Sequence, residues 1–457
     1  MIMKPMTLEQ IARAADGVYV GQEAARGTCI TGVVSDSRAV QPGNLFLCIP
    51  GARADGHDFA PAAYAAGAAC CLAERPLENA AGPYILVRSV LEAVQGVAAF
   101  YRSLFTIPVI GIIGSVGKTT AKEMTAAVLT EKYATLKTEA NLNNELGVPL
   151  TLLRLREAHE AAVVEMGISD FGEMTRLARM VRPDLVVMTA IGHCHLETLG
   201  DLDGVLRAKS EVFAFMRPDA LAVVNGDDEK LAGLEPGVRK LTYGFGAGNP
   251  YRAEDVADRG TEGISCRICT PGSSFPAHIP GFGRHLVLAA LAAAAVGREL
   301  GVTDVQIAAG LGRYAAVGGR ANVIETGRLR VINDCYNANP NSMSASLRSL
   351  AGLAGRRVAV LGDMKELGQA SAELHRGIGR LAAELEIDLL LITGPEAEAI
   401  CAGAREAGMQ NAVYFPDKAA LEAALPGLLA DGDSVLVKAS HGMHFETIVD
   451  VLRGLGA

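Results

Sequence analysis

Residues 109–120 read VIGIIGSVGKTT, an apolar strand followed by a glycine-rich turn and the first residues of a helix. Gly114 and Gly117 let the backbone curl until several N–H groups point at one anion, and the helix adds its positive N-terminal end. Lys118 is placed to reach the terminal phosphates of a nucleotide, and the hydroxyl of Thr119 is placed to bind Mg²⁺. The stretch therefore predicts a binding site for ATP or GTP.

This turn departs from the strict phosphate-loop pattern at one position. The pattern requires a glycine where this chain has Ile112, and the glycines fall at positions 111, 114 and 117 instead. An ordinary tight turn between a strand and a helix is the alternative interpretation. The tetrapeptide GKTT stands between a strand and a strongly helical sequence, AKEMTAAVLTEK, and this context favours nucleotide binding.

Length and composition indicate a soluble α/β protein of several domains. A chain of 457 residues is too long for one hydrophobic core, so roughly two to four domains are expected. Half of the residues are hydrophobic, and tryptophan is absent. The net charge of −9 argues against nucleic acid as a main partner, because phosphate backbones are bound by clustered Lys and Arg.

The cysteines and the apolar segments argue against export, a zinc centre and a membrane span. Nine cysteines are scattered along the chain, and Cys266 with Cys269 lacks the second pair that would complete a zinc site. Reduced thiols are the simplest explanation. The N-terminal residues have no sustained apolar core, and the Ala-rich run at residues 286–297 is too short to span a membrane. We expect a cytoplasmic protein without membrane insertion.

The order of strands and helices divides the chain into three α/β segments, residues 1–88, 89–317 and 318–457. In the second segment, the apolar runs ATLKT, AAVVEMG, LVVMTAIG and LAVVNGDD alternate with helices, as in a doubly wound parallel sheet. Short polar strands in residues 251–280 predict an antiparallel hairpin at the edge of that sheet. Residues 315–320, AAVGGR, are the candidate hinge into a third segment that repeats strand and helix without a phosphate loop.

Polar residues follow several strands of the central segment. Glu165 ends one buried strand, which is costly for a carboxylate unless a cation pairs with it, and His195 follows the next strand along the chain. For one histidine taken alone, an unliganded loop residue is the more frequent case. Because Thr119, Glu165 and His195 each follow a strand of one sheet, together they predict a metal site.

Lys209, in VLRAKSEVF, has two interpretations. It could be a solvated helix lysine paired with a nearby glutamate, which contributes little to stability. If it faces the metal site, an ammonium about 5 Å from a divalent ion costs roughly 7 kcal/mol at an effective dielectric of about 20. In that position the side chain would have to be neutral or chemically modified.

The outer segments carry further polar clusters. In the first segment these are SDSR at residues 35–38 and DGHD at residues 55–58, for which local turn chemistry is the alternative to ligand binding. In the third segment, polar residues follow the first strand pair and the last strand, namely Asp334, Asn337, Asn339, Lys438 and Ser440.

Seven motifs follow one another along the chain: GSVGKTTAKEM, NLNNELGVPLTLL, VVEMGISDFGEM, HLETLGDLDGVLRAKSEVF, DCYNANPNSM, VLGDMKELG and VLVKASHGM. In this order they resemble the Mur ligase family, the ATP-dependent amide-bond formers of peptidoglycan synthesis. The family's phosphate loop shares the departure at Ile112. The resemblance implies an N-terminal domain that binds the UDP end of the substrate, a central ATP-binding domain, and a C-terminal ligase domain that binds the amino substrate and closes on ATP.

The resemblance also implies roles for individual residues. Catalytic roles fall on Lys118, Glu165, His195 and Lys209. Two Mg²⁺ sites are implied, with Thr119, Glu165, His195 and a Lys209 carbamylated by CO₂ as ligands, and carbamylation would turn that cation into an anion. Nucleotide binding is implied for Gly114, Ser115, Gly117, Lys118, Thr119, Thr120, Asn144, Arg320 and Asp334. Binding of the UDP end is implied for Asp36, Ser37, Arg38 and His57. Binding of the amino substrate is implied for Asn337, Asn339, Lys438 and Ser440.

Within the family, YNANPNSM favours the member that joins D-alanyl-D-alanine to UDP-N-acetylmuramoyl-tripeptide through an acyl phosphate, releasing ADP and phosphate. The member that adds the third amino acid is the nearest alternative, and it carries a DNPR motif that this chain lacks. A nucleotide-binding regulatory or scaffold protein is the alternative from another class. Glu165, His195 and Lys209 argue against it. We expect a monomer whose partners are the two small-molecule substrates.

Two positions depart from the family pattern. The stretch GRHLVLAAL has Leu286 and Ala289 in a helix where the family often carries Asn near adenine, and His441 stands where arginine is common. Leu286 and Ala289 therefore leave the contacts to adenine undetermined, and His441 leaves the details of the dipeptide site undetermined.

Overall fold

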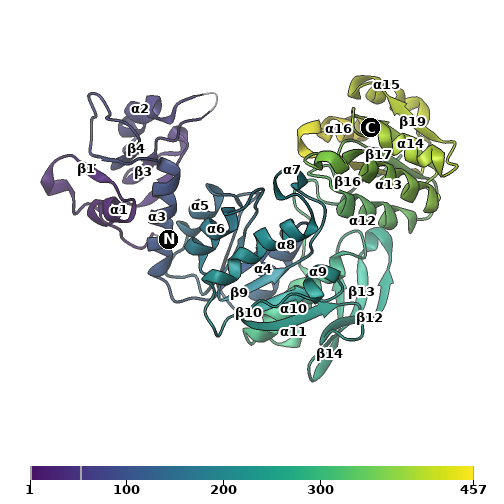
Figure 1. Ribbon diagram of the computed structural model, residues 1–457, viewed down its shortest axis with the longest axis horizontal. Helices are drawn as coiled ribbons and strands as arrows, with labels where there is room; N and C mark the ends of the chain where they lie inside the picture. Colours follow the sequence, from purple (N-terminus) through teal and green to yellow (C-terminus); the bar gives the residue numbers. More distant parts are fainter. Residues whose placement is uncertain (1–2, 52–53, 456–457) are drawn as a thin grey trace.

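The computed structural model describes residues 3–51 and 54–455 and contains three β-sheets, one in each predicted segment (Figure 1). The first and third sheets, each with its own helices, lie toward opposite ends of the long axis, and the second sheet lies between them. The three-domain α/β architecture predicted from the sequence is therefore confirmed.

The N-terminal sheet has five strands in the order β1-β5-β4-β3-β2, and all neighbours are parallel except β1 and β5. Thr7 and Gln10 form the capping box that begins the first helix. The strands are β1 (Val18–Val20), β2 (Gly32–Val34), β3 (Asn44–Leu47), β4 (Cys70–Ala73) and β5 (Tyr84–Leu86), and the helices are α1 (Leu8–Ala14), α2 (Ala60–Ala65) and α3 (Val90–Ser103).

The central sheet has nine strands in the order β14-β13-β12-β11-β10-β9-β6-β8-β7. They are β6 (Val109–Ile113), β7 (Thr135–Lys137), β8 (Ala161–Glu165), β9 (Leu185–Met188), β10 (Leu221–Asn225), β11 (Arg239–Gly244), β12 (Tyr251–Asp258), β13 (Ile264–Thr270) and β14 (Ser273–Ile279). The pairs from β7 to β12 are parallel, whereas β12, β13 and β14 pair antiparallel at one edge, as the turn-rich sequence predicted.

Both faces of the sheet are buried at the parallel strands β6, β8, β9 and β10, which is why these strands read as continuous apolar runs. Val109 and Ile113 of β6 point into one core, and Ile110 and Ile112 point into a second core on the opposite face. The covering helices are α4 (Lys118–Thr130), α5 (Gly147–Leu152), α6 (Glu173–Val181), α7 (Leu196–Leu199), α8 (Leu202–Ser210), α9 (Glu229–Ala232), α10 (Leu286–Glu299) and α11 (Asp304–Gly312). This is the doubly wound arrangement expected from the sequence.

The C-terminal sheet has six strands in the order β15-β16-β20-β17-β18-β19, with one antiparallel pair, β15 and β16. The strands are β15 (Asn322–Glu325), β16 (Arg330–Asn333), β17 (Arg357–Leu361), β18 (Leu389–Thr393), β19 (Ala412–Phe415) and β20 (Ser434–Lys438). The helices are α12 (Pro340–Ala351), α13 (Ser371–Glu384), α14 (Glu398–Glu406), α15 (Lys418–Leu428) and α16 (Glu446–Gly454). The candidate hinge, residues 315–320, lies between α11 and β15.

All nine cysteines are free thiols, and eight of them are buried. In the described part of the chain, the helices fall short of the length and hydropathy needed to cross a bilayer.

Candidate functional site

The glycine-rich turn joins β6 to α4 and forms a backbone cradle. Gly114 and Gly117 have φ angles of +144° and +79°, in the region that favours glycine. A Cβ at Gly114 would lie 2.0 Å from Thr189 Oγ1, so a larger residue cannot fit there without rearrangement. Thr189 Oγ1 donates a hydrogen bond to the carbonyl of Val116 at 2.5 Å and ties the turn to the end of β9. The sequence identified this turn, although it gave no sign of Thr189.

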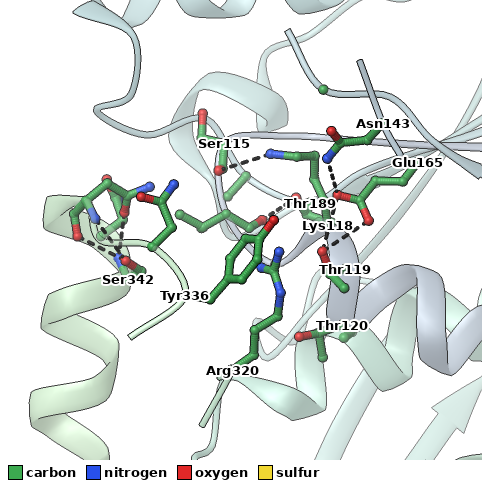
Figure 2. Close-up of a pocket in the computed structure, with 18 of the residues that line it drawn as sticks. Ser115, Lys118, Thr119, Thr120, Asn143, Glu165, Thr189, Arg320, Tyr336 and Ser342 are labelled. Carbon is green, nitrogen blue, oxygen red and sulfur yellow. Dashed lines mark hydrogen bonds between the residues drawn. The ribbon is translucent and has the colours of Figure 1, made fainter. Parts of the chain in front are cut away.

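Lys118 is the first residue of α4, and its side chain folds back onto the turn that forms the cradle. Its Nζ donates to the carbonyl of Gly114 at 2.8 Å and reaches toward that of Ser115 (Figure 2). Burial lowers the pKa of this ammonium, and the nearby Glu165 carboxylate acts in the opposite direction. The lysine therefore sits beside the positive end of the helix, where an anionic phosphate would relieve the cost of its burial.

Glu165 ends β8 beside this cradle and is only 1% exposed. Its carboxylate accepts hydrogen bonds from Thr119 Oγ1 at 3.0 Å and from Asn143 Nδ2 at 2.8 Å (Figure 2). Lys122 Nζ, fully buried on the next turn of α4, lies 3.7 Å from the same carboxylate. The sequence predicted that Glu165 needs a cation, but it did not single out Lys122, although this lysine follows Lys118 at helical spacing.

His195 reaches the same cavity from the loop after β9. Its backbone has a φ of +52°, and its Nδ1 lies 2.5 Å from Glu366 Oε2 of the C-terminal domain. Thr119, Glu165 and His195 all line the cavity. Within the described residues, no three His, Cys, Asp or Glu side chains are clustered tightly enough to hold a metal ion. The predicted ligands thus share a cavity without forming a closed protein cage.

Lys209 lies on α8 and is 1% exposed, so the interpretation as a solvated helix lysine is wrong. Burial is the main cause that lowers its pKa, to about 8. It is not among the residues that line the cavity. Its role as a metal ligand therefore stays a prediction.

A cavity of about 680 Å³ lies between the cradle and the C-terminal domain. It includes almost all the predicted nucleotide residues, and Gly114 alone among them is not part of the lining. The helix with the unusual Leu286 and Ala289 lines it as well. From the C-terminal domain the lining includes Arg320, Asp334, Asn337, Asn339 and Lys438, together with Tyr336, which the sequence did not indicate.

Several of these residues hold the wall in shape. The Arg320 guanidinium lies 3.9 Å from the centre of the Tyr336 ring, in cation–π contact. Asn339 caps α12 by accepting from the Ser342 amide at 2.8 Å, and Asn144 in the same way accepts from the Gly147 amide at 2.8 Å. Their amide oxygens are therefore already engaged, which leaves the amide nitrogens for a ligand.

Ser440 lies outside the cavity lining and is 4% exposed. Its hydroxyl accepts from the Lys365 amide at 2.9 Å, so in this structure it supports the loop after β17. Its predicted contact with the amino substrate stays a prediction.

The four residues predicted to bind the UDP end lie in the N-terminal domain, away from this cavity. Asp36 and Arg38 form an exposed ion pair of 2.7 Å that lowers the pKa of Asp36 to about 2, and Ser37 lies between them in sequence. His57 is buried: its Nδ1 lies 2.6 Å from Asp55, and its Nε2 accepts from the Glu74 amide at 2.9 Å. Both ring nitrogens are therefore occupied within the domain, and substrate contacts of this group stay a prediction.

Comparison with known families matches all three parts of the chain. Residues 29–102 match the Mur ligase family catalytic domain, residues 112–297 the Mur ligase middle domain, and residues 319–441 the Mur ligase glutamate ligase domain. The UDP-N-acetylmuramoyl-tripeptide–D-alanyl-D-alanine ligase of Bacillus subtilis is 36% identical, over 97% of this chain and 97% of its own length. The chain belongs to the Mur ligase family.

Other Mur ligases agree over the whole length. The Escherichia coli enzyme of the same name is 36% identical over 99% of this chain and all of its own. A crystal structure of MurF from Acinetobacter baumannii superposes with a TM-score of 0.91 at 32% identity, covering 99% of this chain. MurF ligase from Thermotoga maritima, solved in complex with ADP, gives a TM-score of 0.83 at 29% identity and covers 93% of this chain and 97% of its own.

Proposed function

We propose that this Mur ligase joins D-alanyl-D-alanine to the terminal carboxylate of UDP-N-acetylmuramoyl-tripeptide and converts ATP into ADP and phosphate. One observation carries the proposal: a single cavity has the β6–α4 cradle on one side and the C-terminal domain on the other. A phosphoryl donor and an amine donor can therefore meet a carboxylate in one place. Relatives named for this reaction match nearly the whole chain.

The first step would be activation of the carboxylate. The cradle amides and Lys118 are fixed donors beside the γ-phosphoryl of bound ATP, and they stabilise its negative charge as the carboxylate oxygen attacks phosphorus. ADP leaves, and an acyl phosphate remains. The amine of D-alanyl-D-alanine then attacks the acyl carbon, the C–O bond to phosphate breaks, and the amine loses a proton. Arg320, on the opposite wall, adds a cation for the phosphates.

The residues around Glu165 fit Mg²⁺. This ion usually takes one or two protein oxygens and completes its shell with phosphates and water, and the cavity offers the Thr119 hydroxyl and the Glu165 carboxylate side by side. His195 lines the same cavity and is the further ligand that we propose. When bound, Mg²⁺ would neutralise charge between the phosphates and the incoming carboxylate.

We further infer that Lys209 is carbamylated and serves a second Mg²⁺. The pKa of about 8 leaves a share of the amine neutral near pH 7, and a neutral amine is the form that reacts with CO₂. Enzyme exposed to ¹³C-labelled bicarbonate should show a carbamate carbon signal that Lys209→Met lacks. Lys209→Ala should lose activity, and excess CO₂ should not restore it. Full activity in either variant would remove this role.

The proposal assigns one task to each domain. The N-terminal domain would bind the UDP end through Asp36, Ser37, Arg38 and His57. The C-terminal domain would bind the dipeptide through Asn337, Asn339, Lys438 and Ser440 and would close about residues 315–320. X-ray scattering should show compaction when an ATP analogue and the UDP substrate are both present, and an unchanged radius of gyration would count against closure.

We also propose a cytoplasmic monomer. Nine free thiols are consistent with a reducing compartment such as the cytoplasm, which also supplies ATP. Analytical ultracentrifugation should give the mass of one chain, and cell fractionation should recover the protein with soluble enzymes.

A phosphate-release assay with ATP and UDP-N-acetylmuramoyl-tripeptide tests the reaction. Release should require D-alanyl-D-alanine, and free D-alanine, L-lysine or diaminopimelate should not replace it. Lys118→Met should abolish release, whereas Lys132→Met, just beyond the C-terminal end of α4, should not. Release with UDP-N-acetylmuramoyl-dipeptide and a single amino acid would instead identify the enzyme that adds the third residue. No release with any pair would favour a nucleotide-binding protein without ligase activity.

A further inference from the structure

Glu366 of the C-terminal domain contacts the central domain at His195 with both its side chain and its backbone. Its Oε2 lies 2.5 Å from His195 Nδ1, and its main-chain carbonyl accepts a hydrogen bond from the Leu196 amide at 2.9 Å. The Leu196 amide belongs to the first residue of α7, so the C-terminal domain caps the helix that follows His195. The two residues are far apart in sequence and meet only because the domains are docked.

Both residues of this contact have left-handed backbones. The φ angles are +52° at His195 and +64° at Glu366, and neither residue is a glycine. Such conformations cost on the order of 1–3 kcal/mol each and persist where the surrounding structure fixes them. The Glu366 side chain is 55% exposed, yet two such backbones facing each other across a domain boundary indicate that the fold specifies the contact.

The loop that carries Glu366 is held from inside the C-terminal domain. The Met364 amide donates to Nε2 of the buried His375 at 2.9 Å, and the Lys365 amide donates to Ser440 Oγ at 2.9 Å. Lys365 Nζ lies 2.7 Å from the buried Asp363 carboxylate. Glu366 is therefore presented from a rigid support, and its position reports where the C-terminal domain is.

A carboxylate on one ring nitrogen of a histidine decides what the other nitrogen can do. With Nδ1 protonated and facing Glu366, Nε2 is the unprotonated nitrogen and keeps its lone pair for a cation. Within the described residues, Nε2 of His195 has no hydrogen-bond partner, and the residue lines the cavity that holds Thr119 and Glu165. Nδ1 and Oε2 are in contact at 2.5 Å, although the two groups are not aligned as a hydrogen bond.

We propose that Glu366 is the positioning residue of His195, and that the C-terminal domain thereby sets the tautomer of a histidine in the central domain. The proposal rests on the proposed function, in which His195 is a ligand of the Mg²⁺ that accompanies ATP. It adds that this ligand is correctly oriented only when the two domains are docked. Domain closure would then prepare the metal site and bring the amino substrate in the same movement.

Nuclear magnetic resonance of the full-length protein, labelled with ¹⁵N-histidine and free of metal, tests the tautomer directly. The His195 signals are assigned by their loss in His195→Asn. His195 should be protonated at Nδ1 in the wild type and in Glu366→Gln, whose amide oxygen still accepts, and should lose this preference in Glu366→Ala. Glu373→Gln is the matched control, because it removes an exposed carboxylate of the same domain. An identical His195 tautomer in wild type and Glu366→Ala would overturn the proposal.

The Mg²⁺ requirement gives the second measurement. Loss of a carboxylate that orients a metal-bound histidine commonly lowers metal affinity about 10–100-fold. In Glu366→Ala, the Mg²⁺ concentration for half-maximal phosphate release should rise by at least about 10-fold, while KM for the UDP substrate at saturating Mg²⁺ stays unchanged. An unchanged Mg²⁺ requirement would overturn the proposal. If even the wild type releases no phosphate, the proposed function fails, and the tautomer measurement still decides the role of Glu366.

Discussion

Lys438 and Asp334 form an ion pair across the neighbouring strands β20 and β16, with 2.6 Å between Nζ and Oδ2. Asp334 also accepts from Ser346 Oγ of α12 at 2.7 Å and from the Ala321 amide after the candidate hinge at 3.0 Å. One carboxylate thus joins the hinge, a helix and two strands at the wall of the cavity. Because the pair is shielded from water, its lysine stabilises an otherwise uncompensated charge.

We expect Lys438→Met to lower the free energy of unfolding by about 3 kcal/mol, because it leaves the Asp334 carboxylate buried without a cation. Urea denaturation followed by circular dichroism would measure the change. Arg453→Met, which removes an exposed partner of Asp450, should cost less than about 0.5 kcal/mol. Equal effects of the two substitutions would show that burial does not strengthen the pair.

The two glycines of the cradle should respond differently to alanine. Gly114→Ala places a Cβ 2.0 Å from Thr189 Oγ1, whereas the nearest atom to a Cβ at Gly117 is Thr189 Cβ at 3.8 Å. Gly117→Ala therefore loses only the free energy needed to hold alanine in a left-handed backbone conformation, about 1–2 kcal/mol. We expect Gly114→Ala to lose ATP binding and Gly117→Ala to keep measurable affinity, as determined by isothermal titration calorimetry. Equal affinities would contradict the steric argument.

Lys122 should matter for stability in a way that Mg²⁺ can compensate. It lies 3.0 Å from Glu123 Oε1 and 3.7 Å from Glu165 Oε2. Lys122→Met leaves the buried Glu165 carboxylate without this cation, whereas Glu123 keeps its ion pair with Lys137. The expected loss of unfolding free energy is about 3 kcal/mol. Because Mg²⁺ with ADP would supply a replacement charge, it should raise Tm more in the variant than in the wild type, measured by calorimetry. Lys132→Met is the control, and an equal rise in Tm would contradict this account.

The sequence predicted those parts of the site that depend on local chemistry. The cradle at residues 114–117 follows from glycines, a lysine and a helix start that are adjacent in sequence, and Glu165 follows from the cost of ending a buried strand with a carboxylate. The hairpin strands at the sheet edge follow from a change of pattern in residues 251–280. In each case the residues concerned carry the signal themselves.

The remainder depends on which surfaces meet after folding. Glu366 lies in VLGDMKELG, a motif that marks the family, but its contact with His195 exists only because two domains dock. Lys122 lies one helical turn after Lys118 on α4. It is buried because α4 packs on the sheet, and the sequence does not show that packing. His57 and Ser440 look like ligand groups in the sequence, whereas neighbouring backbone amides occupy His57 Nε2 and Ser440 Oγ in the fold.

His375 should make the C-terminal domain sensitive to acid. Its imidazole is buried and neutral in the fold, because Nε2 accepts from the Met364 amide, and burial lowers its pKa below the ordinary 6.5. Below pH 6.5, His375 therefore becomes protonated in the unfolded chain while it stays neutral in the folded chain. The free energy of unfolding thus decreases as pH falls from 6.5 toward the lowered pKa. We expect urea denaturation at stepwise lower pH to show this loss in the wild type and a shallower one in His375→Gln. The exposed His278→Gln should keep the wild-type slope, and an unchanged slope in His375→Gln would mean that other groups govern the acid response.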